Sequence, residues 1–203
     1  VRLVQVPAHA TRIMYASQDA QGRPIAVTGT VLTPTAPWTG GGERPVISYA
    51  VGTQGAADRC APSRTLSTGV QYEGVGITSL LSRGHAVVVT DYEGLGTPGT
   101  HTYMVREAQA HAVLDAVRAA AQVSGSGVAA TAPVALAGYS QGGGASAAAA
   151  ELASEYAPEL DLKGAYVGAP PADLVQVADR IDGGLYAAFL LYAMAGQLAA
   201  YDV

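Results

Sequence analysis

Cysteine is almost absent from this sequence, which contains only Cys60 among its 203 residues. One thiol excludes an internal disulfide framework and any zinc site built from several cysteines, because each needs at least two. Charged residues are scarce, at 13%, and the 11 Lys and Arg residues are scattered rather than clustered. With a net charge of −5, this argues against a nucleic-acid partner, since phosphate binding needs clustered basic side chains. We expect no metal ion and no other cofactor.

The sequence also lacks an initiator methionine and a basic segment followed by an apolar run at its start, which reads VRLVQVPAH. We therefore expect that any signal peptide has been removed. What the chain does contain is apolar, because 49% of its residues are hydrophobic. This composition excludes disorder and is enough to bury the core of one ordinary domain.

Strand and helix patterns alternate along most of the chain. Residues 12–34 predict two strands joined by a turn at residues 19–22, where Gly22 permits a positive φ. Later apolar runs predict strands at 46–51, 85–90, 133–137 and 162–167, with helices between them near 75–83, 103–122 and 141–156. This order predicts an α/β fold: a mostly parallel sheet with helices on both faces, led by an antiparallel hairpin.

The helix near residues 103–122 has an amphipathic pattern. Small apolar residues follow the 3.6-residue period on one face, and the other face carries Glu107, His111, Asp115 and Arg118. We therefore expect His111 to point into solvent.

Residues 138–142 read Gly-Tyr-Ser-Gln-Gly, a G-x-S-x-G pattern that arises readily by chance in a chain with 25 glycines. Its position is more informative, because an apolar strand ends and a helix begins there, as in a nucleophile elbow. Ser140 is therefore the candidate nucleophile, and the backbone N–H of Gln141 at the helix start is a candidate oxyanion donor. The alternative is a Gly-rich turn that only packs tightly or binds phosphate.

A second oxyanion donor is expected from the loop at residues 52–55, Gly-Thr-Gln-Gly. This loop follows an earlier strand and should reach the same carboxyl edge of the sheet, where its glycines would let a backbone N–H point into the site. An ordinary turn is the alternative.

Several short motifs follow one another along the chain: Gly52-Thr53-Gln54-Gly55, Asp58-Arg59-Cys60-Ala61-Pro62-Ser63, Asp91-Tyr92-Glu93-Gly94, the Ser140 pentapeptide with Gly143, Tyr156-Ala157-Pro158-Glu159-Leu160, and Gly168-Ala169-Pro170-Pro171. Through them the chain resembles the secretory lipase family of α/β hydrolases, the lipase A type, over about residues 45 to 200. Motifs spaced in order are far more specific than the pentapeptide alone.

The resemblance implies a secreted, extracellular lipase or esterase with a Ser-Asp-His triad and a helical cap over the acyl site. Its substrate would be an ester or lipid, met at a lipid–water interface. Matched motif to motif, the oxyanion donors are the backbone N–H groups of Gln141 and of Gln54 or its neighbour Thr53. Tyr139 and Gly142 border the nucleophile.

The same resemblance matches Cys60 to a family cysteine that forms a disulfide with the cap, so its partner would lie beyond Val203. A buried free thiol is the alternative.

Asp91 ends a predicted strand, which makes it a tempting triad acid. The hydrolase order is Ser, then acid, then His, and Asp91 precedes Ser140. We therefore expect Asp91, together with Glu93, to anchor the loop beside the site by accepting hydrogen bonds from backbone N–H groups.

All four histidines precede the candidate nucleophile: His9, His85, His101 and His111. Of these, only His101, in a Gly- and Pro-rich loop, has approach to the substrate as an alternative to a purely structural role. The triad Asp and His are therefore expected beyond Val203, so that the C-terminal part of the hydrolase fold is missing here. We interpret the chain as part of a longer lipase, or alternatively as a truncated, inactive homologue.

Residues 183–200 form an apolar run interrupted only by Gln197, just long enough to suggest a transmembrane helix. Acidic residues flank the run and no basic anchor follows it, so we expect no membrane span. We interpret it as the first cap helix. Six of its side chains would line an acyl pocket or meet a lipid surface: Leu185, Phe189, Leu190, Tyr192, Met194 and Leu198. Residues 1–173 would then be the N-terminal part of the hydrolase core and 174–203 the start of the cap.

Two other functions remain open from the sequence. An acyltransferase or peptidase on the same fold would use the same nucleophile, and a lipid-binding protein would keep the core without catalysis. Oligomeric state is not predicted.

Overall fold

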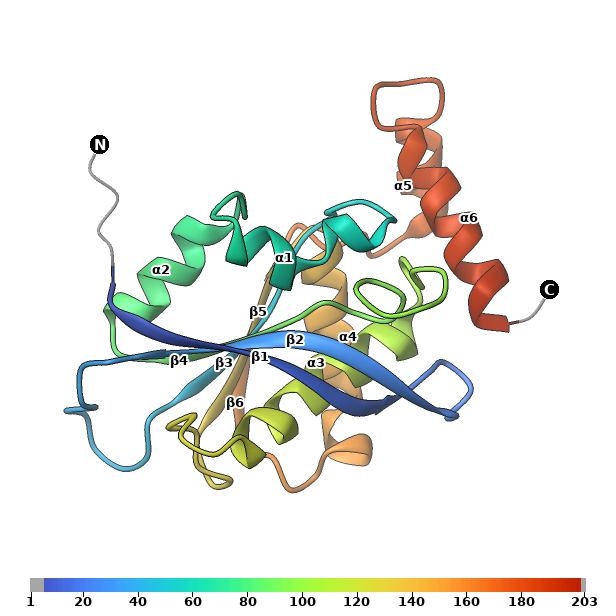
Figure 1. The fold of residues 1–203 in the computed structure, drawn as a ribbon. Coiled ribbons are helices and arrows are strands. Elements are labelled where there is room, and N and C mark those ends of the chain that lie inside the picture. Colours follow the sequence, from blue (N-terminus) through green and yellow to red (C-terminus); the bar gives the residue numbers. More distant parts are fainter. Residues whose placement is uncertain (1–5, 202–203) are drawn as a thin grey trace.

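The computed structural model describes residues 6–201, so the first five and last two residues of the predicted core and cap lie outside it. Its centre is a six-stranded sheet in the order β1-β2-β4-β3-β5-β6 (Figure 1). The strands are β1 (Ala8–Gln18), β2 (Pro24–Pro34), β3 (Val46–Ala50), β4 (Ala86–Thr90), β5 (Val134–Tyr139) and β6 (Leu162–Gly168). β1, β2 and β4 pair antiparallel, whereas β4, β3, β5 and β6 run parallel. The predicted hairpin and parallel sheet are confirmed.

Helices cover both faces of the sheet. α1 (Pro62–Ser67) and α2 (Gly74–Ser82) pack on one face against β2 and β4, and α3 (Arg106–Gln122) and α4 (Gln141–Tyr156) cover the other. A short 3-10 helix, Asp58–Cys60, precedes α1. α5 (Leu174–Ile181) and α6 (Ala188–Tyr201) stand apart from the sheet at one end of the molecule (Figure 1).

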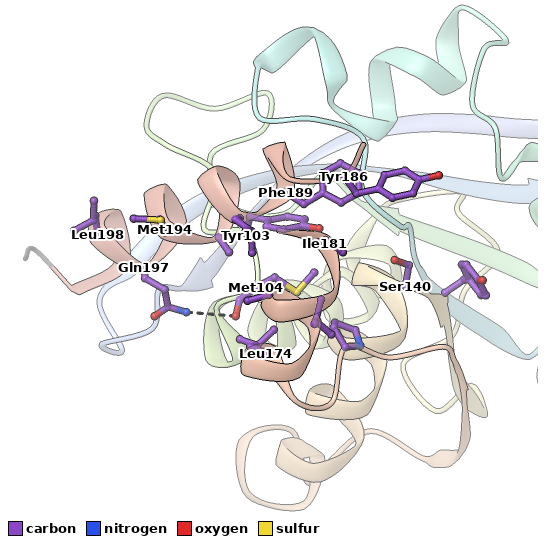
Figure 2. A pocket seen from close by; sticks show the side chains of 16 residues that line it. Tyr103, Met104, Ser140, Leu174, Ile181, Tyr186, Phe189, Met194, Gln197 and Leu198 are labelled. Carbon is purple, nitrogen blue, oxygen red and sulfur yellow. Dashed lines mark hydrogen bonds between the residues drawn. The ribbon is translucent and has the colours of Figure 1, made fainter. Parts of the chain in front are cut away.

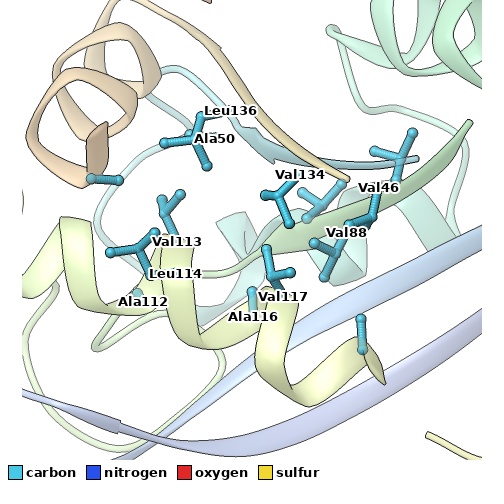
Figure 3. Close-up of a cluster of buried hydrophobic side chains, with 14 of the residues drawn as sticks. Val46, Ala50, Val88, Ala112, Val113, Leu114, Ala116, Val117, Val134 and Leu136 are labelled. Atoms are coloured by element: carbon cyan, nitrogen blue, oxygen red, sulfur yellow. The ribbon is translucent and has the colours of Figure 1, made fainter. Parts of the chain in front are cut away.

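The main core lies between the sheet and α3. Val46, Val88 and Val134 from three adjacent strands face the helix, which presents small residues such as Ala112 and Ala116 (Figure 3). Every residue of β4 is buried, which explains its uninterrupted apolar sequence, since a central parallel strand is covered on both faces. Small side chains on α3 let the helix approach the sheet closely.

The expectation that His111 faces solvent is wrong. Its ring stacks on Tyr156 at the end of α4, with 4.1 Å between ring centroids. Asp115, one turn further along α3, is buried as well and accepts hydrogen bonds from the hydroxyl groups of Ser17 and Tyr156, both at 2.7 Å. The reason is that α3 is wedged between β1 and α4, so its polar side is also covered.

Two boundaries also differ from the prediction. α3 begins at Arg106 rather than near Tyr103. Met104 adopts a left-handed φ of 62° and Val105 is extended, and neither conformation is helical. In the C-terminal region, α5 precedes the predicted apolar helix, which itself begins at Ala188. The 14 residues of α6 make it about 21 Å long, short of the roughly 30 Å of a bilayer core. Among the described residues, no helix combines the length and apolarity of a membrane span.

Candidate active site

Ser140 lies between the end of β5 and the first residue of α4. Its backbone adopts φ 56° and ψ −118°, a conformation that a non-glycine residue rarely takes. Hydrogen bonds fix this turn, because the N–H of Ser140 donates to Gly168 at 2.9 Å and its carbonyl group accepts from Gly144 at 3.0 Å. The side chain of Ser140 does not cap α4. A strained serine with an uncommitted hydroxyl group, at a strand-to-helix turn, has the geometry of a nucleophile elbow.

The glycines around Ser140 are required by close backbone contacts. A Cβ atom at Gly142 would overlap the carbonyl group of Ala50 at the end of β3, and one at Gly138 would overlap the carbonyl group of Gly142. Gly143 meets the carbonyl group of Gly168 in the same way. The strand and the helix can therefore meet at this sharp angle only because these positions have no side chain.

The loop that follows β3 lies directly beside the elbow. A Cβ atom at Gly52 would come within 3.1 Å of the carbonyl oxygen of Tyr139. The N–H of Gly52 donates to Glu73 Oε1 at 2.5 Å, so this donor is already engaged. The N–H groups of Thr53 and Gln54 come next along the loop, at the edge of the sheet where the carboxyl ends of β3 and β5 meet.

Side chains hold this loop from both sides. The amide of Gln71 donates to Gln54 Oε1 at 3.3 Å, and the hydroxyl groups of Thr53 and Tyr103 are hydrogen-bonded at 2.7 Å. Burial and the Glu73 carboxylate raise the pKa of Tyr72, whose hydroxyl group also approaches Gly52. The sequence did not point to Glu73 or Tyr103, because these contacts join segments 21 and 50 residues apart.

Asp91 is fully buried and lies at the end of β4. Its carboxylate accepts hydrogen bonds from the backbone N–H and the hydroxyl group of Ser63, both at 2.6 Å, and from the hydroxyl group of Thr28 at 2.7 Å. Burial raises its pKa, although these hydrogen bonds favour the ionised form. The carboxyl group therefore ties α1 to β2. Glu93 instead accepts from the side chain of Thr102.

His101 approaches the elbow, but through the protein interior. It is 2% exposed and is not among the residues that line the cavity beside Ser140, so it is not placed to contact a substrate there. Its Nε2 lies 3.0 Å from the side-chain amide nitrogen of Gln141, which is also buried.

A cavity of about 890 Å³ opens beside Ser140, between the sheet edge and helices α5 and α6 (Figure 2). Its walls are mainly apolar and include Tyr103, Met104, Ile181, Phe189 and Met194. Ser140 lies at one end of the cavity, and the α6 residues extend away from it (Figure 2).

Of the six residues expected to line an acyl pocket or meet a lipid surface, four line this cavity: Phe189, Leu190, Met194 and Leu198. Leu185 is 91% exposed and lies outside the cavity, because it precedes α6 in the turn between the two helices. Tyr192 does not line the cavity. Its ring packs against that of Phe189 and lies edge-on against that of Tyr103, and both of these residues do line it. Tyr103 and the α5 residues were not predicted from the sequence.

Cys60 is half-buried and carries no disulfide within residues 6–201. Its pairing with a cysteine outside the chain stays a prediction. No cluster of potential metal ligands occurs among the residues that the structure describes.

A serine elbow after a parallel strand, with an adjoining loop at the same sheet edge and helices on both faces, defines an α/β hydrolase. Residues 60–202 match the model of the secretory lipase family. The chain belongs to the secretory lipase family.

Curated relatives agree with this assignment. The chain is 36% identical to a protein named "Probable inactive lipase MT1628" from Mycobacterium tuberculosis, over 91% of this chain and 42% of that protein. It is 32% identical to Lipase 10 of Candida albicans, over 97% of this chain and 43% of the lipase. The chain therefore spans less than half the length of these relatives.

Solved structures show the same fold. The closed state of Candida antarctica lipase A superposes with a TM-score of 0.83 and 27% identity, covering 98% of this chain and 49% of the lipase. The rice cell wall degrading esterase LipA from Xanthomonas oryzae superposes with a TM-score of 0.76 and 25% identity, covering 98% of this chain and 54% of the esterase. The predicted α/β-hydrolase fold is confirmed.

Proposed function

We propose that this chain is the nucleophile-bearing part of a secreted serine lipase or esterase. The observation that carries the proposal is the strained backbone of Ser140, which lies at an apolar cavity with no capping bond from its hydroxyl group. Membership of the secretory lipase family supports the reaction class and the secretion. The apolar walls of the cavity favour an acyl chain as the group bound there.

In the proposed reaction, Ser140 Oγ attacks the carbonyl carbon of an ester and forms a tetrahedral intermediate. The backbone N–H groups of Gln141 and of Gln54 or Thr53 stabilise the oxyanion, aided by the positive end of α4. The intermediate expels the alcohol and leaves an acyl group on Ser140, which water then removes.

A histidine must take the proton of Ser140 and pass it to the leaving alcohol. All four histidines lie at positions that the structure describes, and each has other surroundings. His101 contacts Gln141, His111 contacts Tyr156, His85 lies beside Trp38, and His9 pairs with Thr33 in the β1–β2 hairpin. We therefore assign the triad histidine and its acid to the part of a longer protein that the relatives contain and this chain does not span.

The proposal also gives a role to α5 and α6. We assign residues 174–203 to the start of a cap and residues 1–173 to the N-terminal part of the hydrolase core. Both helices expose large apolar side chains, among them Val175, Leu191 and Met194. An exposed apolar surface beside the cavity would favour contact with a lipid–water interface.

Replacing Ser140 with alanine in the full-length protein tests this function. We expect Ser140→Ala to lower kcat for a p-nitrophenyl ester by at least about a thousandfold, because the nucleophile is lost. Ser146→Ala is the matched control, since Ser146 lies in α4 and is fully buried; its activity should stay within about twofold of the parent, as for a site away from the chemistry. Unchanged hydrolysis by Ser140→Ala would contradict the proposal.

A lipid-binding protein without catalysis is the second candidate, because the relative from Mycobacterium tuberculosis is named a probable inactive lipase. That function predicts binding of a fatty acid or ester in the cavity without turnover by the full-length protein. Hydrolysis that depends on Ser140 would exclude it.

A further inference from the structure

His101 is fixed in the interior by the loop between β4 and α3. The loop closes tightly at Gly94, where φ is 73° and a Cβ atom would overlap the backbone of Thr100 and His101. The imidazole ring packs between Tyr92 and Tyr103, at centroid distances of 5.8 and 5.9 Å. The orientation of the ring is therefore set by packing before any substrate binds.

Hydrogen bonding determines which nitrogen of His101 carries the proton. Nδ1 lies 2.8 Å from the carbonyl oxygen of Glu93, which can only accept, so Nδ1 must donate. Nε2 then has a free lone pair and accepts from the side-chain N–H of Gln141 at 3.0 Å. Burial lowers the pKa of His101 to about 4, which keeps the imidazole neutral, as this pair of bonds requires.

Gln141 needs such a restraint because of the residues that follow it. It is the first residue of α4, so its own N–H has no acceptor one turn earlier in the helix. Positions 142–144 are all glycine, and glycine gives the first turn of a helix little stiffness of its own. Among residues 141–144, only Gln141 has a side chain that can hydrogen-bond to another part of the protein.

We propose that His101 is a positioning residue, which holds the side chain of Gln141 so that its backbone N–H points toward the oxyanion formed at Ser140. This inference rests on the proposed function, because it assigns the Gln141 N–H to the oxyanion hole. His101 touches neither substrate nor the reacting atoms. Its effect passes through Gln141 and should therefore appear in kcat more than in KM.

The test is a double-mutant cycle on hydrolysis of a p-nitrophenyl ester by the full-length protein. His101→Phe keeps an aromatic ring and removes both hydrogen bonds, and Gln141→Met keeps the length of the side chain without its amide. We expect each change to lower kcat at least about tenfold with KM altered less than about twofold, because a misplaced oxyanion donor weakens the transition state. The double variant should be no slower than the slower single variant, because both remove one interaction.

His101→Gln should recover part of the loss, since its amide carbonyl can accept the bond from Gln141. His111→Phe is the matched control. His111 is also a buried histidine near backbone carbonyl groups, but it stacks on Tyr156, about 24 Å along α4 from Ser140. Its kcat should equal that of the parent.

Three results would overturn the inference. These are a kcat for His101→Phe within about twofold of the parent, losses that multiply in the double variant, or an equal loss in His111→Phe. If His101→Phe does not fold, Gln141→Met with His101 in place gives the same test, and an unchanged kcat would overturn the inference. Failure of the proposed function looks different, because Ser140→Ala would then retain activity whatever the His101 variants do.

Discussion

At the scale of single residues, the elbow depends on which positions lack a side chain. Gly138, Gly142 and Gly143 each lie against a backbone carbonyl group, so their role is to let a strand, a helix and a neighbouring loop meet at one point. Ser140 keeps its positive φ because these contacts and its hydrogen bond to Gly168 fix the backbone on both sides of it.

Gly142→Ala should therefore be damaging although it adds a single methyl group. The new Cβ would overlap the carbonyl group of Ala50, and relief requires a shift of β3 or α4. We expect destabilisation by about 1–3 kcal/mol or more, measured by urea unfolding. Gly164→Ala in β6 is the control, because open space surrounds that position; equal stability of the two variants would contradict this explanation.

The same scale shows what the sequence could and could not predict about the site. Ser140 and its glycines were found because a local pattern, strand then turn then helix, identifies them. His101, Glu73 and Tyr103 act through contacts with residues 40, 21 and 50 positions away. No local period or motif carries such contacts, so only the fold could place them.

At the scale of elements, apolar periodicity predicted the sheet strands and α4 well. Periodicity did not predict burial or helix position where these depend on the neighbouring elements. The polar face of α3 is covered by β1 and α4, so His111 and Asp115 are buried despite an amphipathic pattern. α5 has eight residues and buries none of them fully. A segment this short is hard to recognise from its pattern beside the longer apolar run that follows it.

α5 owes its start to Asp173, whose carboxylate accepts hydrogen bonds from the N–H groups of Gln176 and Val175, both at 3.0 Å. The hydrogen bonds that Asp173 accepts from Gln176 lower its pKa, the one from the backbone N–H more than the one from the side-chain amide. The ionised carboxylate thus stabilises α5 in full above about pH 4, the ordinary range of an aspartate. This stabilisation is lost as the pH falls through the lowered pKa.

Asp173→Ala should accordingly speed amide hydrogen exchange in α5 at pH 7, by removing the cap. In the parent protein, the protection of α5 should decline below about pH 4 ahead of that of α4. Asp179→Ala, which removes a charge from the same helix without touching the cap, is the control. Equal exchange in the two variants would show that the cap does not hold α5.

At the scale of the whole molecule, the sheet brings three segments to one edge: the loop after β3, the elbow after β5, and α5–α6 beyond β6. The first two supply backbone N–H groups and a hydroxyl group, and the third supplies apolar walls. A parallel sheet makes this possible because the carboxyl ends of its strands share an edge. The fold class was predictable from the order of strands and helices. The cavity was not, because α5 and Tyr103, which both line it, are far apart in the sequence.

The most direct test of the central claim is chemical labelling of Ser140. The full-length protein would be treated with a fluorophosphonate, digested, and mapped by peptide mass. We predict one phosphonyl group per chain, located on Ser140, because only an activated serine beside an oxyanion hole reacts. An unlabelled Ser140, under conditions in which a known serine hydrolase is labelled completely, would contradict it.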